Sequence, residues 1–176
     1  MKIIGLTGPA GSGKSTIARL LCERHGFLET SFAAPIRDLV QLLTGMDDEE
    51  LAASKEDPHP LLCGHSPRHA MQTLGTEWGR RMIGEDLWIR HVEAILNERH
   101  AADARIVISD VRFQNEAAWI RERGELWHLT RPGTAVNPHA SENGVVVCDC
   151  DIVLDNDCAL DELVDRLAAT LGAGCA

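Results

Sequence analysis

The sequence lacks the features that would place the chain in a membrane or divide it into several domains. Its longest apolar stretches are far shorter than the roughly 20 residues that a membrane-spanning helix needs. The N-terminus runs into a glycine-rich loop without a signal peptide. No repeat, low-complexity tract or Pro/Ser-rich linker interrupts the 176 residues. These absences predict one domain in the cytoplasm with no membrane partner.

Positive charge is also scarce. The chain has 17 Lys and Arg against 27 Asp and Glu, and its formal net charge of −10 argues against a surface that binds nucleic acid. A nucleotide-sized anion needs only a few local arginines, so this charge does not exclude one. The six cysteines are expected to be free thiols, and the acidic run 47–50 is expected to be a solvated first helical turn.

Short apolar segments alternate with segments of helical periodicity. Strands are expected at 2–7, 27–32, 105–109, 125–130 and 152–154. Helices are expected at 15–25, 35–43, 47–55, 66–83, 86–99, 114–123 and 160–171. Short apolar strands that alternate with helices indicate an α/β fold, in which helices cover both faces of a parallel sheet. Ligands of such folds bind at the carboxyl ends of the strands.

A phosphate-binding pattern follows the first expected strand. The segment Gly8-Pro9-Ala10-Gly11-Ser12-Gly13-Lys14-Ser15 fits G-x-x-x-x-G-K-[ST]. Its glycines let backbone N–H groups point at a phosphate, and the following helix N-terminus adds positive potential. Lys14 is expected to bridge the β- and γ-phosphates of ATP, and Ser15 to ligate Mg²⁺. The expected ATP-binding residues of this loop are Gly8, Gly11, Ser12, Gly13, Lys14, Ser15 and Thr16.

Two further absences narrow the class of nucleotide-binding protein. The chain has no N-K-x-D motif, with which a GTPase would read its base. A short chain without a nucleic-acid-binding surface disfavours motors and helicases. Small-molecule kinases remain, and they need an acceptor site that faces the phosphate loop, with several cations to hold two anionic substrates together.

Four more segments, taken in their order along the chain, form a recognisable set. They are Ser31-Phe32-Ala33-Ala34-Pro35-Ile36-Arg37, Gln72-Thr73-Leu74-Gly75-Thr76-Glu77-Trp78-Gly79-Arg80, Asp110-Val111-Arg112-Phe113-Gln114-Asn115-Glu116 and His139-Ala140-Ser141-Glu142. This set resembles the bacteriophage-type deoxynucleoside monophosphate kinases of the adenylate-kinase-like P-loop group, over roughly residues 3–157. The resemblance implies ATP- and Mg²⁺-dependent conversion of a deoxynucleoside monophosphate to its diphosphate, in the host cytoplasm if a phage encodes the chain.

The predicted architecture is one P-loop kinase domain over residues 1–176. Its sheet is expected to have five parallel strands with helices on both faces. A helical acceptor-binding region is expected as an insertion at about 33–100, and a lid-like loop at about 131–144. A homodimer is left open.

Residues after the later strands are candidates for the chemistry. Asp110 closes an apolar strand, where a carboxylate would hold the metal or its water; the alternative is a loop-capping aspartate. Arg112 would stabilise charge on the transferring phosphoryl group, or else form a surface ion pair. Arg131 opens the loop 132–138 and would act from a lid. Asn156 follows the last strand, where backbone contacts with adenine are expected from related kinases. The expected catalytic residues are Lys14, Asp110, Arg112 and Arg131.

The acceptor side is less sharply marked. Arg37 begins the helix after the second strand, where this fold holds the acceptor phosphate. Trp78 could stack on the acceptor base or anchor the core. His139 and the pair 141–142 could cap a helix or order the lid. The expected acceptor-binding residues are Arg37, Arg68, Gln72, Trp78, Arg80, Asp110 and Arg112.

Two clusters of metal-ligating residue types are discounted. His59, Cys63, His65 and His69 lack the paired C-x₂₋₄-C of structural zinc sites, so a loop without zinc is expected. The cysteines within 148–158 are similarly incomplete and are expected to be thiols.

Two alternatives to a deoxynucleoside monophosphate kinase stay open. One is a P-loop kinase of another small molecule, such as a coenzyme precursor, which acceptor screening would identify. The other is a non-catalytic nucleotide-binding protein, against which the intact Lys14, Ser15, Asp110 and Arg112 speak. The base and the sugar of the acceptor depend on pocket shape, which the sequence does not specify.

Overall fold

The computed structural model describes residues 1–99, 101, 103–132, 144–157 and 160–173. The chain divides into two compact units. We call Met1–Thr30 with Ala101–Ala176 the sheet unit, and Ser31–His100 the helical unit. The helical unit has nearly the extent of the insertion predicted at about 33–100. Within the described ranges, no helix combines the length and the apolar character needed to cross a membrane.

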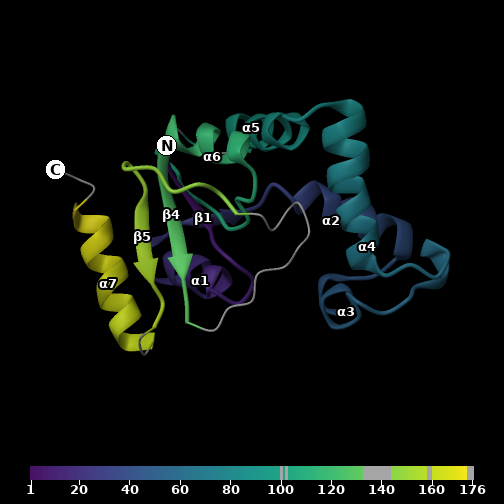
Figure 1. Ribbon diagram of the computed structural model, residues 1–176, viewed down its shortest axis with the longest axis horizontal. Helices are drawn as coiled ribbons and strands as arrows, with labels where there is room; N and C mark the ends of the chain where they lie inside the picture. Colours follow the sequence, from purple (N-terminus) through teal and green to yellow (C-terminus); the bar gives the residue numbers. More distant parts are fainter. Residues whose placement is uncertain (100, 102, 133–143, 158–159, 174–176) are drawn as a thin grey trace. The chain divides into compact units, whose positions relative to one another are not determined.

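Five parallel strands form the sheet, as the sequence predicts. Their spatial order is β2 (Leu28–Thr30), β3 (Arg105–Ile108), β1 (Lys2–Thr7), β4 (Gly124–Thr130), β5 (Ile152–Asp155). Each neighbouring pair is parallel, so all five strands end at one edge, which we call the carboxyl edge. β2 is shorter than the predicted 27–32 because its pairing with β3 covers only three residues. Figure 1 shows β4 beside β5, with α7 next to β5.

Helices cover both faces of the sheet. They are α1 (Lys14–His25), α6 (Gln114–Arg121) and α7 (Leu160–Ala173). Ile4 and Leu6 of β1 share a buried core with residues of α1 and α7, such as Leu163. Gly5 faces α6 instead, where an added Cβ would lie 2.9 Å from Ile120 Cγ2. The central strand therefore has no polar side chain between Ile3 and Leu6, because both of its faces are buried there.

The helical unit contains short helices of three kinds. They are α2 (Ala34–Thr44), α3 (Asp48–Ala53), the 3₁₀ turn η1 (Pro60–Leu62), α4 (Pro67–Gln72), the π-helix η2 (Thr73–Ile83) and α5 (Leu87–Arg99). The acidic run is the exposed start of α3, as predicted. There Asp47 Oδ1 accepts a hydrogen bond from Glu50 N at 2.8 Å, and Glu50 Oε2 accepts one from Asp47 N at 3.0 Å. This reciprocal capping box satisfies two amides of the helix start.

The helical segment predicted at 66–83 is present, with its start as predicted. Ser66 caps α4 by accepting from His69 N, and Pro67 occupies the first position. After Gln72 the chain stays helical to Ile83, but its backbone widens into the π-helix η2. The sequence analysis did not specify this widening.

The widened segment is packed against an indole ring. Trp88 Nε1 of α5 donates to Gly75 O at 2.9 Å, and a Cβ on Gly79 would lie 2.5 Å from Trp88 Cζ2. Gly79 thus lets the buried ring approach the helix backbone directly, and the Gly75 carbonyl accepts its hydrogen bond. This contact joins residues of two helices, so helical periodicity alone does not signal it.

Candidate active site

The phosphate loop connects β1 to α1 at the carboxyl edge. Three of its glycines have left-handed φ angles, which are 141° at Gly8, 79° at Gly11 and 100° at Gly13. There is also no room for a side chain at Gly8, because a Cβ there would lie 2.3 Å from Leu129 O of β4. The loop therefore needs glycine at these positions for both conformation and packing.

The polar groups of the loop suit a phosphate. Lys14 Nζ donates to Gly8 O at 2.6 Å and to Pro9 O at 2.9 Å, so the ammonium lies along the loop. Ser12 Oγ is buried and has no hydrogen-bond partner among the described residues. A buried hydroxyl left unpaired beside a helix N-terminus and an ammonium group fits an anionic ligand, and ATP phosphates meet that requirement. Ser15, in the first turn of α1, is exposed and available to a metal ion.

Asn156 fixes the phosphate loop from the side of β5. Its backbone N donates to Thr130 O at 2.8 Å, and its Nδ2 donates to Ser12 O at 2.9 Å. Nδ2 would lie 2.1 Å from a Cβ on Gly13, so the amide packs directly on the loop. The side chain thus contacts the phosphate loop, which the sequence did not predict, whereas the predicted contact with adenine stays a prediction.

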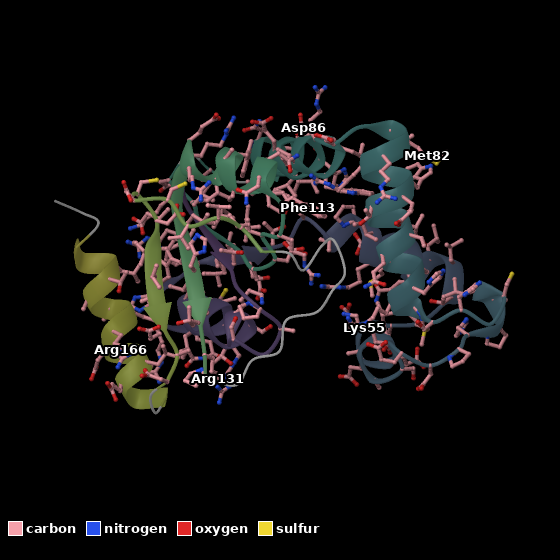
Figure 2. All side chains as sticks on the ribbon, in the orientation of Figure 1. Lys55, Met82, Asp86, Phe113, Arg131 and Arg166 are labelled. Atoms are coloured by element: carbon pink, nitrogen blue, oxygen red, sulfur yellow. The ribbon has the colours of Figure 1, made fainter. Side chains whose placement is uncertain are left out.

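Two arginines lie near the ends of β4 and β5. Figure 2 shows Arg131 at the end of β4 and Arg166 on α7. Arg166 Nη1 donates to Asp155 O at 2.8 Å and to Asp157 Oδ1 at 3.1 Å, which holds the end of β5. Arg131 is exposed, as a residue that meets a ligand must be. Its predicted place in a lid stays a prediction, because residues 133–143, with His139, Ser141 and Glu142, lie outside the described residues.

The segment after β3 carries Asp110 and Arg112. Ser109 N donates to Thr30 O at 3.2 Å, and Val111 N donates to Leu6 O at 3.1 Å, so this segment runs beside the end of β1. The Val111 side chain is only 2% exposed, whereas Asp110 is half-buried and Arg112 is exposed. The buried valine therefore leaves its two polar neighbours at the surface of the carboxyl edge.

Glu116 was missed by the sequence reasoning. It lies in the first turn of α6 and is only 3% exposed, although it carries a carboxylate. Its Oε2 accepts hydrogen bonds from Arg112 N at 2.8 Å and Phe113 N at 3.0 Å. A glutamate three residues after a helix boundary is half of the capping-box signature, but Phe113 stands where the signature has Ser or Thr.

A buried ionic cluster behind β4 was also missed. The Asp151 side chain is 0% exposed and accepts from Arg121 Nε at 2.8 Å and Nη2 at 2.6 Å. His128 Nε2 lies 2.9 Å from its Oδ2, and Cys148 N donates to the same atom at 2.8 Å. Burial alone would raise the pKa of Asp151, but these hydrogen bonds, led by that from Arg121, hold its pKa well below the ordinary value. The cluster joins α6, β4 and the segment before β5.

The acceptor candidates Arg37, Arg68, Gln72, Trp78 and Arg80 belong to the helical unit. Arg37 is exposed in the first turn of α2. Arg68 forms an ion pair with Glu56. Gln72 ends α4, and Arg80 lies on η2. Their predicted roles in acceptor binding stay predictions.

Trp78 is partly packed and partly exposed. Its ring lies 6.3 Å from that of Trp88, at 48° between the ring planes, so it packs beside a buried residue of its own unit. It also keeps 41% of its surface exposed, which leaves area for a ligand.

The histidine- and cysteine-containing loop is described in full. The rings of His65 and His69 stack at 4.4 Å, and Cys63 is an exposed free thiol. Across the described part of the chain, no three His, Cys, Asp or Glu side chains are grouped so that they could hold a metal ion.

Comparisons with known proteins agree on one family. The family profile described as deoxynucleotide monophosphate kinase matches residues 64–167. A protein of Acanthamoeba polyphaga mimivirus that bears the same family name is 35% identical over 187 residues, covering 95% of this chain and 94% of its own. The deoxynucleoside-5′-monophosphate kinase of Escherichia phage T5 is 26% identical, with 81% and 84% covered.

Solved structures with this fold were also found. TT1252 from Thermus thermophilus has a TM-score of 0.58 at 18% identity, with 99% of this chain and 98% of that chain covered. A sugar kinase from Janibacter sp. HTCC2649 has a TM-score of 0.52 at 16% identity, with 98% and 95% covered. At these identities the likeness concerns the fold alone.

Proposed function

Because the chain belongs to the deoxynucleotide monophosphate kinase family, we propose that its carboxyl edge is where a phosphoryl group passes from ATP to a deoxynucleoside monophosphate. The protein is an enzyme, a kinase that acts on nucleotides. One observation carries the proposed location. The phosphate loop holds the Lys14 ammonium and the unpaired, buried Ser12 hydroxyl beside the start of α1.

The donor is held by the phosphate loop. Backbone N–H groups at the start of α1 and the Ser12 hydroxyl bind the phosphates, and Lys14 exchanges its contacts with Gly8 O and Pro9 O for phosphate oxygens. Ser15 and Asp110 are the residues that would hold Mg²⁺, and when bound the ion supplies charge neutralisation. The oxygen donors that both residues offer are the ligands that Mg²⁺ prefers.

Arginines act on the charge that develops during transfer. Arg112 extends from the segment whose backbone is fixed beside β1, and Arg131 from the end of β4. Guanidinium groups at such positions stabilise the charge on the equatorial oxygens of the transferring group. They stabilise this charge more strongly in the transition state than in the ground state. This is why both are assigned to catalysis rather than to binding alone.

Acceptor binding is assigned to residues of the helical unit. Arg37, exposed at the start of α2, would hold the acceptor phosphate, and the exposed part of Trp78 offers a surface on which a base can stack. The assigned residues are Arg37, Arg68, Gln72, Trp78 and Arg80.

The test is phosphorylation of a panel of ribo- and deoxynucleoside monophosphates and coenzyme precursors, followed by coupled detection of ADP. We expect turnover with deoxynucleoside monophosphates in ATP and Mg²⁺, and loss of turnover in EDTA. Protein carrying Lys14→Ala, purified in the same way, measures the background from contaminating kinases. Turnover of a coenzyme precursor alone, or of no acceptor, would contradict the proposal.

A further inference from the structure

The segment that carries Asp110 and Arg112 is fixed through its backbone at both ends. At its start, Ser109 N and Val111 N donate to the ends of β2 and β1. At its other end, the amides of Arg112 and Phe113 both donate to a single carboxylate oxygen, Glu116 Oε2. The backbone that bears the two polar side chains is therefore held on one side by strands and on the other by one buried side chain.

Glu116 differs from an ordinary helix-capping glutamate in that it is buried. A carboxylate that is 3% exposed is expensive to bury, and the two amides, together with the N-terminus of α6, compensate for that burial. Both hydrogen bonds reach back along the chain by three and four residues, to the part that leaves the carboxyl edge. Removing the carboxylate would take away the acceptor that these two amides share.

The helical unit contains the same contact in a different setting. Glu50 Oε2 accepts from Asp47 N at 3.0 Å at the start of α3, but both residues are exposed, and neither neighbours a residue assigned to the chemistry. Both glutamates accept from the amide three residues before them, but only Glu116 also accepts from the amide four residues before it and is joined to the segment after β3. Glu50 is the natural control for Glu116.

We propose that Glu116 is a positioning residue for phosphoryl transfer, which holds the Arg112 and Phe113 amides so that Asp110 and Arg112 keep the orientation that transfer needs. It does not itself touch a substrate. The proposal rests on the function proposed above, because Asp110 and Arg112 have their roles from it. Misplacement of a catalytic group by about 1 Å lowers rates on the order of a hundredfold, so the effect is expected in kcat.

The experiment compares Glu116→Gln, Glu116→Asp and Glu116→Ala with the wild type. Gln keeps an oxygen at the same reach and loses the charge, whereas Asp keeps the charge and is one methylene too short. Positioning predicts that Gln stays within about threefold of wild-type kcat, and that Asp and Ala lose about ten- to a hundredfold with KM values nearly unchanged. Glu50→Asp and Glu50→Ala should leave kcat unchanged.

A second measurement needs no substrate. Hydrogen exchange of the Arg112 and Phe113 amides, followed by NMR on the free protein, should be slow in the wild type and in Glu116→Gln and fast in Glu116→Asp and Glu116→Ala. Slow exchange in a wild type that phosphorylates no nucleotide would refute the proposed function and leave the contact intact. Fast exchange in the wild type would overturn the positioning role, even where Glu116→Ala does not fold.

Three kinetic outcomes also overturn it. A working Asp variant with a failing Gln variant would mean that the charge matters and the reach does not. Equal losses in the Glu50 and Glu116 variants would reduce the effect to helix capping. Full kcat in all three Glu116 variants would remove any role in transfer.

Discussion

The sheet unit and the helical unit hold their candidate residues in different ways. In the sheet unit, a backbone oxygen of the neighbouring strand holds the chain at or beside some of the candidates, as Leu6 O does for Val111 and Thr130 O for Asn156. In the helical unit the candidates Arg37 and Trp78 project from helix surfaces. A hydrogen bond to the neighbouring strand fixes the backbone at a strand end. A side chain on a helix surface keeps more freedom to change its conformation.

The largest expected effect is the difference in kcat between Lys14→Ala and Lys2→Ala. Lys14 lies on the phosphate loop, and Lys2 begins β1 at the opposite edge, paired with Glu125 at 3.3 Å. Loss of Lys14 should lower kcat by at least about a thousandfold, on the order of 4 kcal/mol, because it contacts the transferring phosphate. Loss of Lys2 should leave kcat unchanged. Coupled ADP assays and circular dichroism measure both, and equal rates for Lys14→Ala and wild type would remove the chemistry from the carboxyl edge.

The next largest effect concerns the stability of the sheet unit. Asp151→Asn leaves Arg121 without its carboxylate partner and should lower the free energy of unfolding by about 3 kcal/mol at pH 7. The depressed pKa of Asp151 stabilises the fold above the unfolded value near 3.8, so the difference from wild type should shrink as pH falls below about 4. Urea unfolding between pH 7 and pH 3 measures it. Asp149→Asn, at an exposed neighbouring position, is the control. If the difference in free energy of unfolding between Asp151→Asn and the wild type did not change with pH, the stabilising role of the Asp151 carboxylate would be contradicted.

Division of labour between the two units is tested by Arg37→Ala and Arg131→Ala. Arg37 should affect the acceptor, so its loss should raise the acceptor KM and spare the ATP KM. Arg131 should contact charge that develops during transfer, so its loss should lower kcat. A charge-assisted hydrogen bond contributes roughly 1.5–3 kcal/mol, which corresponds to about ten- to a hundredfold in each case. Steady-state kinetics with both substrates varied measure these KM and kcat values. A raised KM for ATP in Arg37→Ala, with an unchanged KM for the acceptor, would reverse the two assignments.

The smallest effect belongs to the packing of the helical unit. Gly79→Ala places a methyl group against Trp88 and should lower the free energy of unfolding by about 1–2 kcal/mol and raise the acceptor KM slightly. Gly84→Ala is the matched control, because a Cβ there meets nothing within 4 Å. Thermal unfolding of the two variants compares them. Equal melting temperatures would show that the close approach of indole and backbone is not needed.

Local patterns predicted the donor side well. The spacing of Gly8, Gly13 and Lys14 encodes a loop between a strand and a helix, and all of its determinants lie within a few residues. β1 and β3 were predictable for the same reason, since each contains a short apolar run. Asp110 was predictable as the residue that closes such a run.

Contacts between distant residues were not predictable. Asn156 reaches Ser12 across more than half of the chain, and Asp151 gathers Arg121 and His128 from two other elements. The π-helix has the same cause, because its packing partner belongs to the next helix. A helical pattern records which face is apolar, but not which ring will press against it.

The central place of β1 has a consequence for how the protein is made. β1 ends at Thr7, but its two neighbours begin at Arg105 and Gly124. At roughly 5–20 residues per second, the ribosome needs at least several seconds to supply them. The helical unit, one continuous stretch, leaves the ribosome before then. The phosphate loop is therefore translated well before the two strands that flank β1, and a nascent chain that stops before β3 lacks both of these neighbours.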